Sequence, residues 1–177
     1  MPLIIVEGVD GSGKTTLIQN FRQVASRLCW LFARSGPPQG PNDLDETIRY
    51  LSLHRRYQTP LITDRHPLIS EPIYGPICRD KSLIESLGWS REEALNQIAH
   101  TADRVIYCRP ELEVAIKASR VQRQMEGVEQ QFWALYQAYD KAMQDLLQRG
   151  VNVIRYDWHD ENLRGSLSDL NRLFLGV

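Results

Sequence analysis

The chain of 177 residues has little cysteine, little lysine and almost no net charge. Its three cysteines make no Cys-x-x-Cys pair, which argues against a metal site or a disulfide and favours buried thiols in a reducing compartment. A formal net charge of −1 argues against nucleic-acid and membrane partners. No apolar run approaches the length of a membrane span, and Met1-Pro2 leads directly into an apolar segment, which leaves no room for a signal peptide. We therefore expect a soluble, cytoplasmic protein.

One of the four lysines, Lys14, lies in the most informative segment of the chain. Residues Gly8 to Thr15 read Gly-Val-Asp-Gly-Ser-Gly-Lys-Thr, which is the pattern of a phosphate-binding loop. The loop joins an apolar segment to an amphipathic one, so we expect a strand before it and, after it, a helix whose positive N-terminal end attracts phosphate. Lys14 is expected to reach the outer phosphates of a nucleotide and the Thr15 hydroxyl to bind Mg²⁺. We therefore predict ATP and Mg²⁺ as cofactors, with nucleotide contacts from Gly8, Asp10, Gly11, Ser12, Gly13, Lys14, Thr15 and Thr16.

The rest of the chain alternates short apolar segments with amphipathic ones, as in a buried parallel sheet covered by helices. Strands are predicted over Leu3–Glu7, Cys29–Ala33, Leu61–Thr63, Val105–Cys108 and Val151–Tyr156. Helices are predicted over Lys14–Leu28, Asn42–Tyr57, Ser90–Ala102, Glu111–Val121, Glu129–Gln148 and Leu163–Phe174. Ser90 and Glu93 form a capping box, and an aromatic stripe that includes Tyr136 and Tyr139 is predicted to be core. The pattern predicts one α/β domain over residues 1–177: a three-layer α/β/α sandwich with a five-stranded parallel sheet.

A second motif ends the third predicted strand, where Leu61-Ile62-Thr63 is followed by Asp64-Arg65. The strand delivers the carboxylate of Asp64 beside the phosphate loop, where it is suited to hold Mg²⁺. Arg65 is suited to clamp a phosphate group. The chain has no Asn-Lys-x-Asp segment after its later strands, which disfavours a GTPase.

The phosphate loop, read as Ile5 to Thr16 and taken with Asp64-Arg65, resembles the thymidylate kinase family of nucleoside monophosphate kinases. The resemblance is strong over residues 1–20, good over Tyr50–Tyr74, and elsewhere rests on the order of the elements. It implies transfer of the ATP γ-phosphoryl group to a deoxynucleoside monophosphate (dNMP), and a homodimer. Deoxynucleoside kinases, in which Glu7 is a candidate base, are the alternative, while Asp10 and Asp64 favour the monophosphate kinase. A non-catalytic nucleotide-binding module is a third hypothesis.

The resemblance also implies roles for single residues on the acceptor side. Asp10 would meet the acceptor sugar 3′-OH or a Mg²⁺-bound water, and Arg65 the acceptor phosphate. Arg34, which follows the second strand, resembles the arginine that the family carries ahead of a Gly/Pro loop. Either Arg55 or Arg56 would reach toward the acceptor base, and Tyr74 would pack against the sugar where a ribose 2′-OH would stand.

Glu71 departs from the family pattern, which has a neutral amide-type contact near the base. An ionised carboxylate accepts hydrogen bonds and donates none, so it suits the exocyclic amines of adenine, cytosine or guanine better than the O4 of thymine. We therefore hypothesise an acceptor specificity that is broadened or moved away from dTMP. The alternative is that Glu71 is only a loop carboxylate.

The phosphate loop carries no arginine, so positive charge for the migrating phosphoryl group must come from elsewhere. By resemblance, a short lid over residues 119–128 supplies it through Arg120 and Arg123, which are spaced to lie on one side of a helical turn. After the last strand, Trp158 and His159 would stack on the donor adenine. A surface turn is the equally open interpretation of that segment.

Overall fold

A computed structural model describes residues 3–25, 30–33, 37–53, 60–121, 127–160 and 174. Five parallel strands form one sheet in the order β2-β3-β1-β4-β5. The strands are β1 Leu3–Glu7, β2 Trp30–Ala33, β3 Leu61–Asp64, β4 Arg104–Cys108 and β5 Val153–Tyr156. All five lie where the sequence predicts a strand, and the predicted five-stranded parallel sheet is confirmed. In this order β1 lies between β3 and β4, and the chain continues to one side of it with β3 and β2 and to the other side with β4 and β5. The carboxyl end of β1 therefore opens at the switch point where α/β proteins bind ligands.

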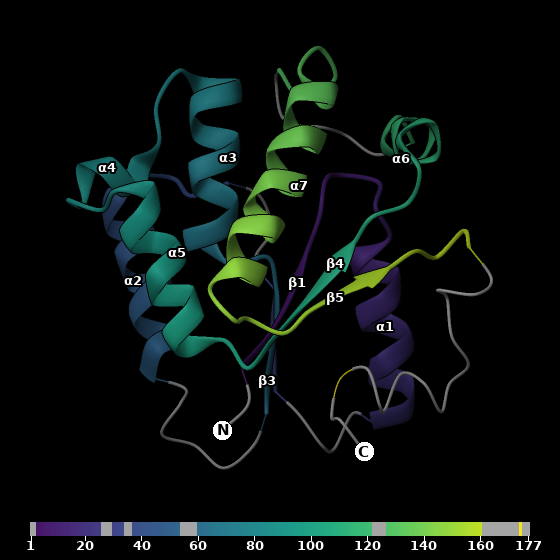
Figure 1. The fold of residues 1–177 in the computed structure, drawn as a ribbon, viewed down its shortest axis with the longest axis horizontal. Helices are drawn as coiled ribbons and strands as arrows, with labels where there is room; N and C mark the ends of the chain where they lie inside the picture. Colours follow the sequence, from purple (N-terminus) through teal and green to yellow (C-terminus); the bar gives the residue numbers. More distant parts are fainter. Residues whose placement is uncertain are drawn as a thin grey trace.

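Helices cover both faces of the sheet (Figure 1). One face carries α1 Lys14–Ala25, and α6 Leu112–Ser119 lies beyond the carboxyl ends of the strands. The other face carries α2 Pro41–Leu53, α3 Pro67–Arg79, α4 Leu83–Ser86, α5 Arg91–Thr101 and α7 Phe132–Gln148. Because side chains alternate along a strand, Leu3 and Ile5 enter the core beneath α3 and α7, while Ile4 and Val6 enter the core beneath α1. The predicted three-layer sandwich is therefore confirmed.

The sequence pattern does not predict helices α3 and α4. Pro72 and Pro76 lie inside α3, and each removes a backbone hydrogen bond. The helix forms because His66 caps its start, with Nδ1 accepting a hydrogen bond from the N–H of Leu68 at 3.2 Å, and because Pro67 stands at the first helical position, where a proline is tolerated. Its buried side chains then pack on α5 and α7. Tertiary packing outweighs the local signal here.

The boundaries of the remaining elements shift by a few residues. The capping box between Ser90 and Glu93 is present at the start of α5. Helix α7 begins at Phe132, three residues later than predicted. The predicted helix over Leu163–Phe174 lies almost wholly outside the described residues. Among the described residues, no helix has the length and apolar character needed to cross a membrane.

Candidate functional site

The phosphate loop connects β1 to α1, and other parts of the chain pack closely against two of its glycines. Gly11 has a φ of 75° and Gly13 a φ of 89°, a left-handed conformation that side chains rarely adopt. A Cβ atom on Gly11 would lie 2.5 Å from the backbone of α6, and one on Gly13 would lie 2.5 Å from the Trp158 ring. Both glycines are therefore required by conformation and by space. The loop is held between α6 and the segment that follows β5.

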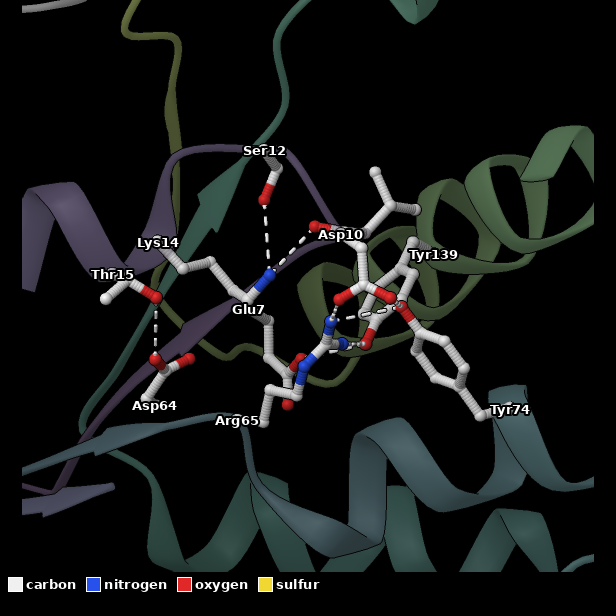
Figure 2. A network of polar contacts seen from close by, with 10 residues as sticks. Glu7, Asp10, Ser12, Lys14, Thr15, Asp64, Arg65, Tyr74 and Tyr139 are labelled. Atoms are coloured by element: carbon white, nitrogen blue, oxygen red, sulfur yellow. Dashed lines mark hydrogen bonds and ion pairs between the residues drawn. The ribbon is translucent and has the colours of Figure 1, made fainter. Parts of the chain in front are cut away.

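Lys14 lies almost fully buried beneath this loop, with 7% of its surface exposed. Its Nζ donates a hydrogen bond to the Val9 carbonyl at 2.8 Å and a longer one to the Ser12 hydroxyl at 3.5 Å (Figure 2). Burial, together with the nearby charge of Arg65, lowers the pKa of Lys14 to about 8. A phosphate bound in the loop would supply the counter-charge that this ammonium group lacks.

Asp64 and Thr15 together fit a Mg²⁺ site. The Thr15 hydroxyl lies 3.4 Å from Asp64 Oδ2, and Asp64 Oδ1 is buried without a hydrogen-bond partner. Mg²⁺ prefers oxygen ligands and is usually held by one or two protein groups plus phosphate oxygens and water. Two protein oxygens of this kind suit a metal that arrives with a nucleotide. Within the described part of the chain, no three His, Cys, Asp or Glu residues form a metal cage.

Arg65 is the centre of a polar cluster beside the loop. Its Nη2 donates to Asp10 Oδ1 at 2.5 Å and to the Tyr74 hydroxyl at 3.0 Å, and its Nη1 donates to the Tyr139 hydroxyl at 2.6 Å (Figure 2). The Tyr74 hydroxyl in turn donates to Asp10 Oδ2 at 3.3 Å. Burial opposes the charged form of Asp10, but the charges of Arg65 and Lys14 outweigh it and hold the pKa of Asp10 below its usual range.

The backbone of Arg65 also adopts the left-handed conformation, with a φ of 67°. For a residue with a side chain this costs about 1–2 kcal/mol. Two hydrogen bonds hold it: the Arg65 N–H donates to the Val6 carbonyl at 2.9 Å, and the Thr63 hydroxyl donates to the Arg65 carbonyl at 2.6 Å. The strained turn aims the guanidinium at Asp10, and strain held in this way is typical of functional positions.

Glu7 lies under the cluster and is fully buried. Its Oε1 accepts the backbone N–H of His66 at 2.6 Å, and its Oε2 accepts the Tyr139 hydroxyl at 3.1 Å. Burial raises the pKa of Glu7 to about 7, against the opposing influence of Arg65. The sequence pattern predicts Tyr139 as core only. It is core, but its hydroxyl also joins Glu7 to Arg65.

Glu71 requires a correction, because it lies inside α3 rather than in a loop and is only 3% exposed. Both of its oxygens accept from Arg79 Nη2, at 2.6 and 2.5 Å, and Oε1 also accepts the N–H of Leu83 at 2.8 Å. The carboxylate is therefore engaged within the protein. The hypothesis that it presents a free acceptor edge to the substrate base is not carried forward.

Of the remaining predicted site residues, the structure describes Arg120 and Trp158. Arg120 follows α6 and is mostly exposed, with Nε 3.4 Å from Glu129 Oε1. Trp158 packs on Gly13 of the loop, with its Nε1 buried and without a hydrogen-bond partner. Four predicted residues, Arg34, Arg55, Arg56 and Arg123, lie outside the described residues.

Comparison with known proteins gives the class of the fold. No protein-family model and no curated protein sequence matches the chain. The YorR protein from Bacillus subtilis, solved in complex with phosphorylated GDP, is 19% identical with a TM-score of 0.66 over 95% of this chain and 92% of that one. Deoxyadenosine kinase from M. mycoides, solved with the products dCMP and dCDP, is 14% identical with a TM-score of 0.57 over 98% of this chain and 97% of that one. The same kinase with bound dATP is 13% identical with a TM-score of 0.54 over the same shares. The chain therefore has a P-loop nucleoside and nucleotide kinase-like fold.

Proposed function

We propose that this protein is a deoxynucleoside monophosphate kinase of the thymidylate kinase type, which transfers the γ-phosphoryl group of ATP to the phosphate of a dNMP. The observation that carries the proposal is the position of Arg65, whose guanidinium lies 2.5 Å from Asp10 of the phosphate loop. A cation beside the loop suits an acceptor that brings its own negative charge. A neutral nucleoside offers no anionic group to this guanidinium, whose present partner is the Asp10 carboxylate.

In the proposed reaction an oxygen of the acceptor phosphate attacks the γ-phosphorus, the bond to the bridging β–γ oxygen breaks, and ADP leaves. The loop N–H groups and Lys14 bind the donor phosphates. Thr15 and Asp64 would hold Mg²⁺, which would neutralise charge on the donor phosphates. Arg65 neutralises and aligns the acceptor phosphate. Arg120 and Arg123 bring further positive charge to the migrating group.

The surroundings of Glu7 also favour a phosphate acceptor over a hydroxyl acceptor. A sugar hydroxyl has a high pKa and benefits from a general base within hydrogen-bond reach. Glu7, the candidate base at the end of β1, is fully buried, and its two oxygens accept hydrogen bonds from the N–H of His66 and the hydroxyl of Tyr139. Asp10 is paired with Arg65, and that pair lowers its basicity.

A deoxynucleoside kinase is the second candidate, because similar folds include a deoxyadenosine kinase. The test is phosphoryl transfer from MgATP by the wild-type protein to four dNMPs and, in parallel, to the four deoxynucleosides. We expect diphosphate products and no monophosphate products. Transfer to nucleosides alone would establish the alternative, and ATP binding without transfer to any acceptor would indicate a non-catalytic module. Lys14→Ala is the inactive control for contaminating kinases.

A further inference from the structure

The guanidinium of Arg65 already has an anionic partner. We propose that Asp10 is a specificity-determining residue that occupies the face of Arg65 needed by an acceptor phosphate, so that only an acceptor with its own anionic group displaces it. The inference rests on the proposed function, in which Arg65 binds the acceptor phosphate. It adds a reason why a nucleoside would be refused.

The hydrogen-bond donors of Arg65 support this exchange. A guanidinium has five N–H groups. Both groups on Nη2 are taken, by Asp10 and by Tyr74, and one on Nη1 is taken by Tyr139. The end-on bidentate face of a guanidinium uses Nη1 with Nη2, and the side-on face uses Nε with Nη2. Either face therefore needs Nη2, and a bidentate phosphate must displace a partner from it.

Asp10 is the partner that must leave. A phosphate and a carboxylate on the same nitrogen would place two anions within a few ångströms of each other, where they repel. The Tyr74 hydroxyl is neutral and now donates to Asp10 Oδ2. Once Asp10 has moved, this hydroxyl is free to donate to a phosphate oxygen instead. Tyr139 keeps Nη1 in place through its own bond to Glu7, so the guanidinium does not have to move.

The pair is also accessible to a ligand. The side chains of Arg65 and Asp10 are 25% and 27% exposed, although the cluster beneath them is buried. A nucleoside has no charge with which to replace the carboxylate. Its binding would therefore leave the pair intact, with the acceptor face of Arg65 still occupied by Asp10.

The experiment compares Asp10→Asn with wild type by calorimetric binding, with a non-hydrolysable ATP analogue filling the phosphate loop. Each dNMP and its deoxynucleoside are titrated separately. Removing the competing charge is expected to tighten dNMP binding about fivefold to tenfold and to leave nucleoside binding unchanged. Asp10→Ala, which removes the carboxylate altogether, is expected to act in the same direction.

The chain offers a matched control in Asp140, which pairs with Arg109 at 2.5 and 2.8 Å outside the phosphate loop. The side chains of that pair are 27% and 30% exposed, close to the values for Arg65 and Asp10. Asp140→Asn should leave both affinities unchanged. Equal weakening of dNMP and nucleoside binding in the Asp10 variants would make Asp10 a sugar contact and overturn the proposal, as would unchanged dNMP affinity. Failure of the proposed function is separate, because it is read from phosphoryl transfer by the wild-type protein.

Discussion

A single methyl group at Gly11 tests whether the phosphate loop and α6 are packed together. In the structure, a Cβ on Gly11 would lie 2.5 Å from both the Ala115 carbonyl oxygen and the Ser119 backbone nitrogen. These are backbone atoms of α6, so no side-chain rotation relieves the overlap. Gly88 is the matched control, because its φ of 78° is nearly that of Gly11 and a Cβ there would meet no atom within 4 Å.

The expected magnitudes follow from separating strain from overlap. Alanine in the left-handed conformation costs about 1–2 kcal/mol, and the loss of unfolded-state freedom returns about 0.4–1 kcal/mol. Gly88→Ala should therefore destabilise by about 1 kcal/mol. Gly11→Ala adds about 1–3 kcal/mol of overpacking, so its total is about 2–4 kcal/mol. Urea unfolding followed by circular dichroism gives both values.

Nucleotide binding should change together with stability. A displaced loop should weaken MgATP binding in Gly11→Ala, whereas Gly88→Ala should bind MgATP as wild type does. If Gly11→Ala loses no more stability than Gly88→Ala, then α6 does not pack against the loop. Contact with α6 would then not be the reason for a glycine at position 11.

Three further predictions concern the carboxylates. Glu71→Ala should destabilise the protein by about 2–4 kcal/mol, because it leaves Arg79 without its buried partner. The relative turnover of the four dNMPs should stay unchanged, and a changed order of preference among them would restore Glu71 as a contact of the acceptor base. Burial raises the pKa of Glu7 from 4.5 to about 7, so the folded state holds a proton that the unfolded state has lost between these pH values. The unfolding free energy of wild type relative to Glu7→Gln should therefore fall by about 3 kcal/mol from pH 4.5 to 7 and stay level above it, as urea titrations at several pH values will show. Asp64→Asn should raise the Mg²⁺ concentration for half-maximal activity about 10–100-fold, with Mg²⁺-free ATP binding little changed; an unaltered Mg²⁺ requirement would remove Asp64 from the metal site.

The sequence predicts the sheet well because buried parallel strands are short, apolar and separated by helical patterns. All five strands lie where short apolar segments such as Leu3–Glu7 predict them. Helix α3 escapes prediction because Pro72 and Pro76 are local signals against a helix, whereas the buried faces that stabilise it exist only once α5 and α7 are in place. The error at Glu71 has the same origin. If the segment around Glu71 were a loop, its carboxylate would be exposed to solvent. In helix α3 the same carboxylate faces Arg79 and forms an ion pair with it.

Tyr139 shows a second reason why part of the site could not be predicted from the sequence. The spacing of the aromatic residues on α7 assigns Tyr139 to the buried face, and it is fully buried. Periodicity identifies a face but not the groups opposite it, so it does not distinguish a tyrosine from a phenylalanine at that position. The hydroxyl does distinguish them, because a buried hydroxyl without a partner is costly. In this fold the partners are Arg65 after β3 and Glu7 at the end of β1. A buried tyrosine whose hydroxyl bonds to residues at the carboxyl ends of the strands is therefore a candidate site residue, and the hydrogen-bond partners of that hydroxyl identify it.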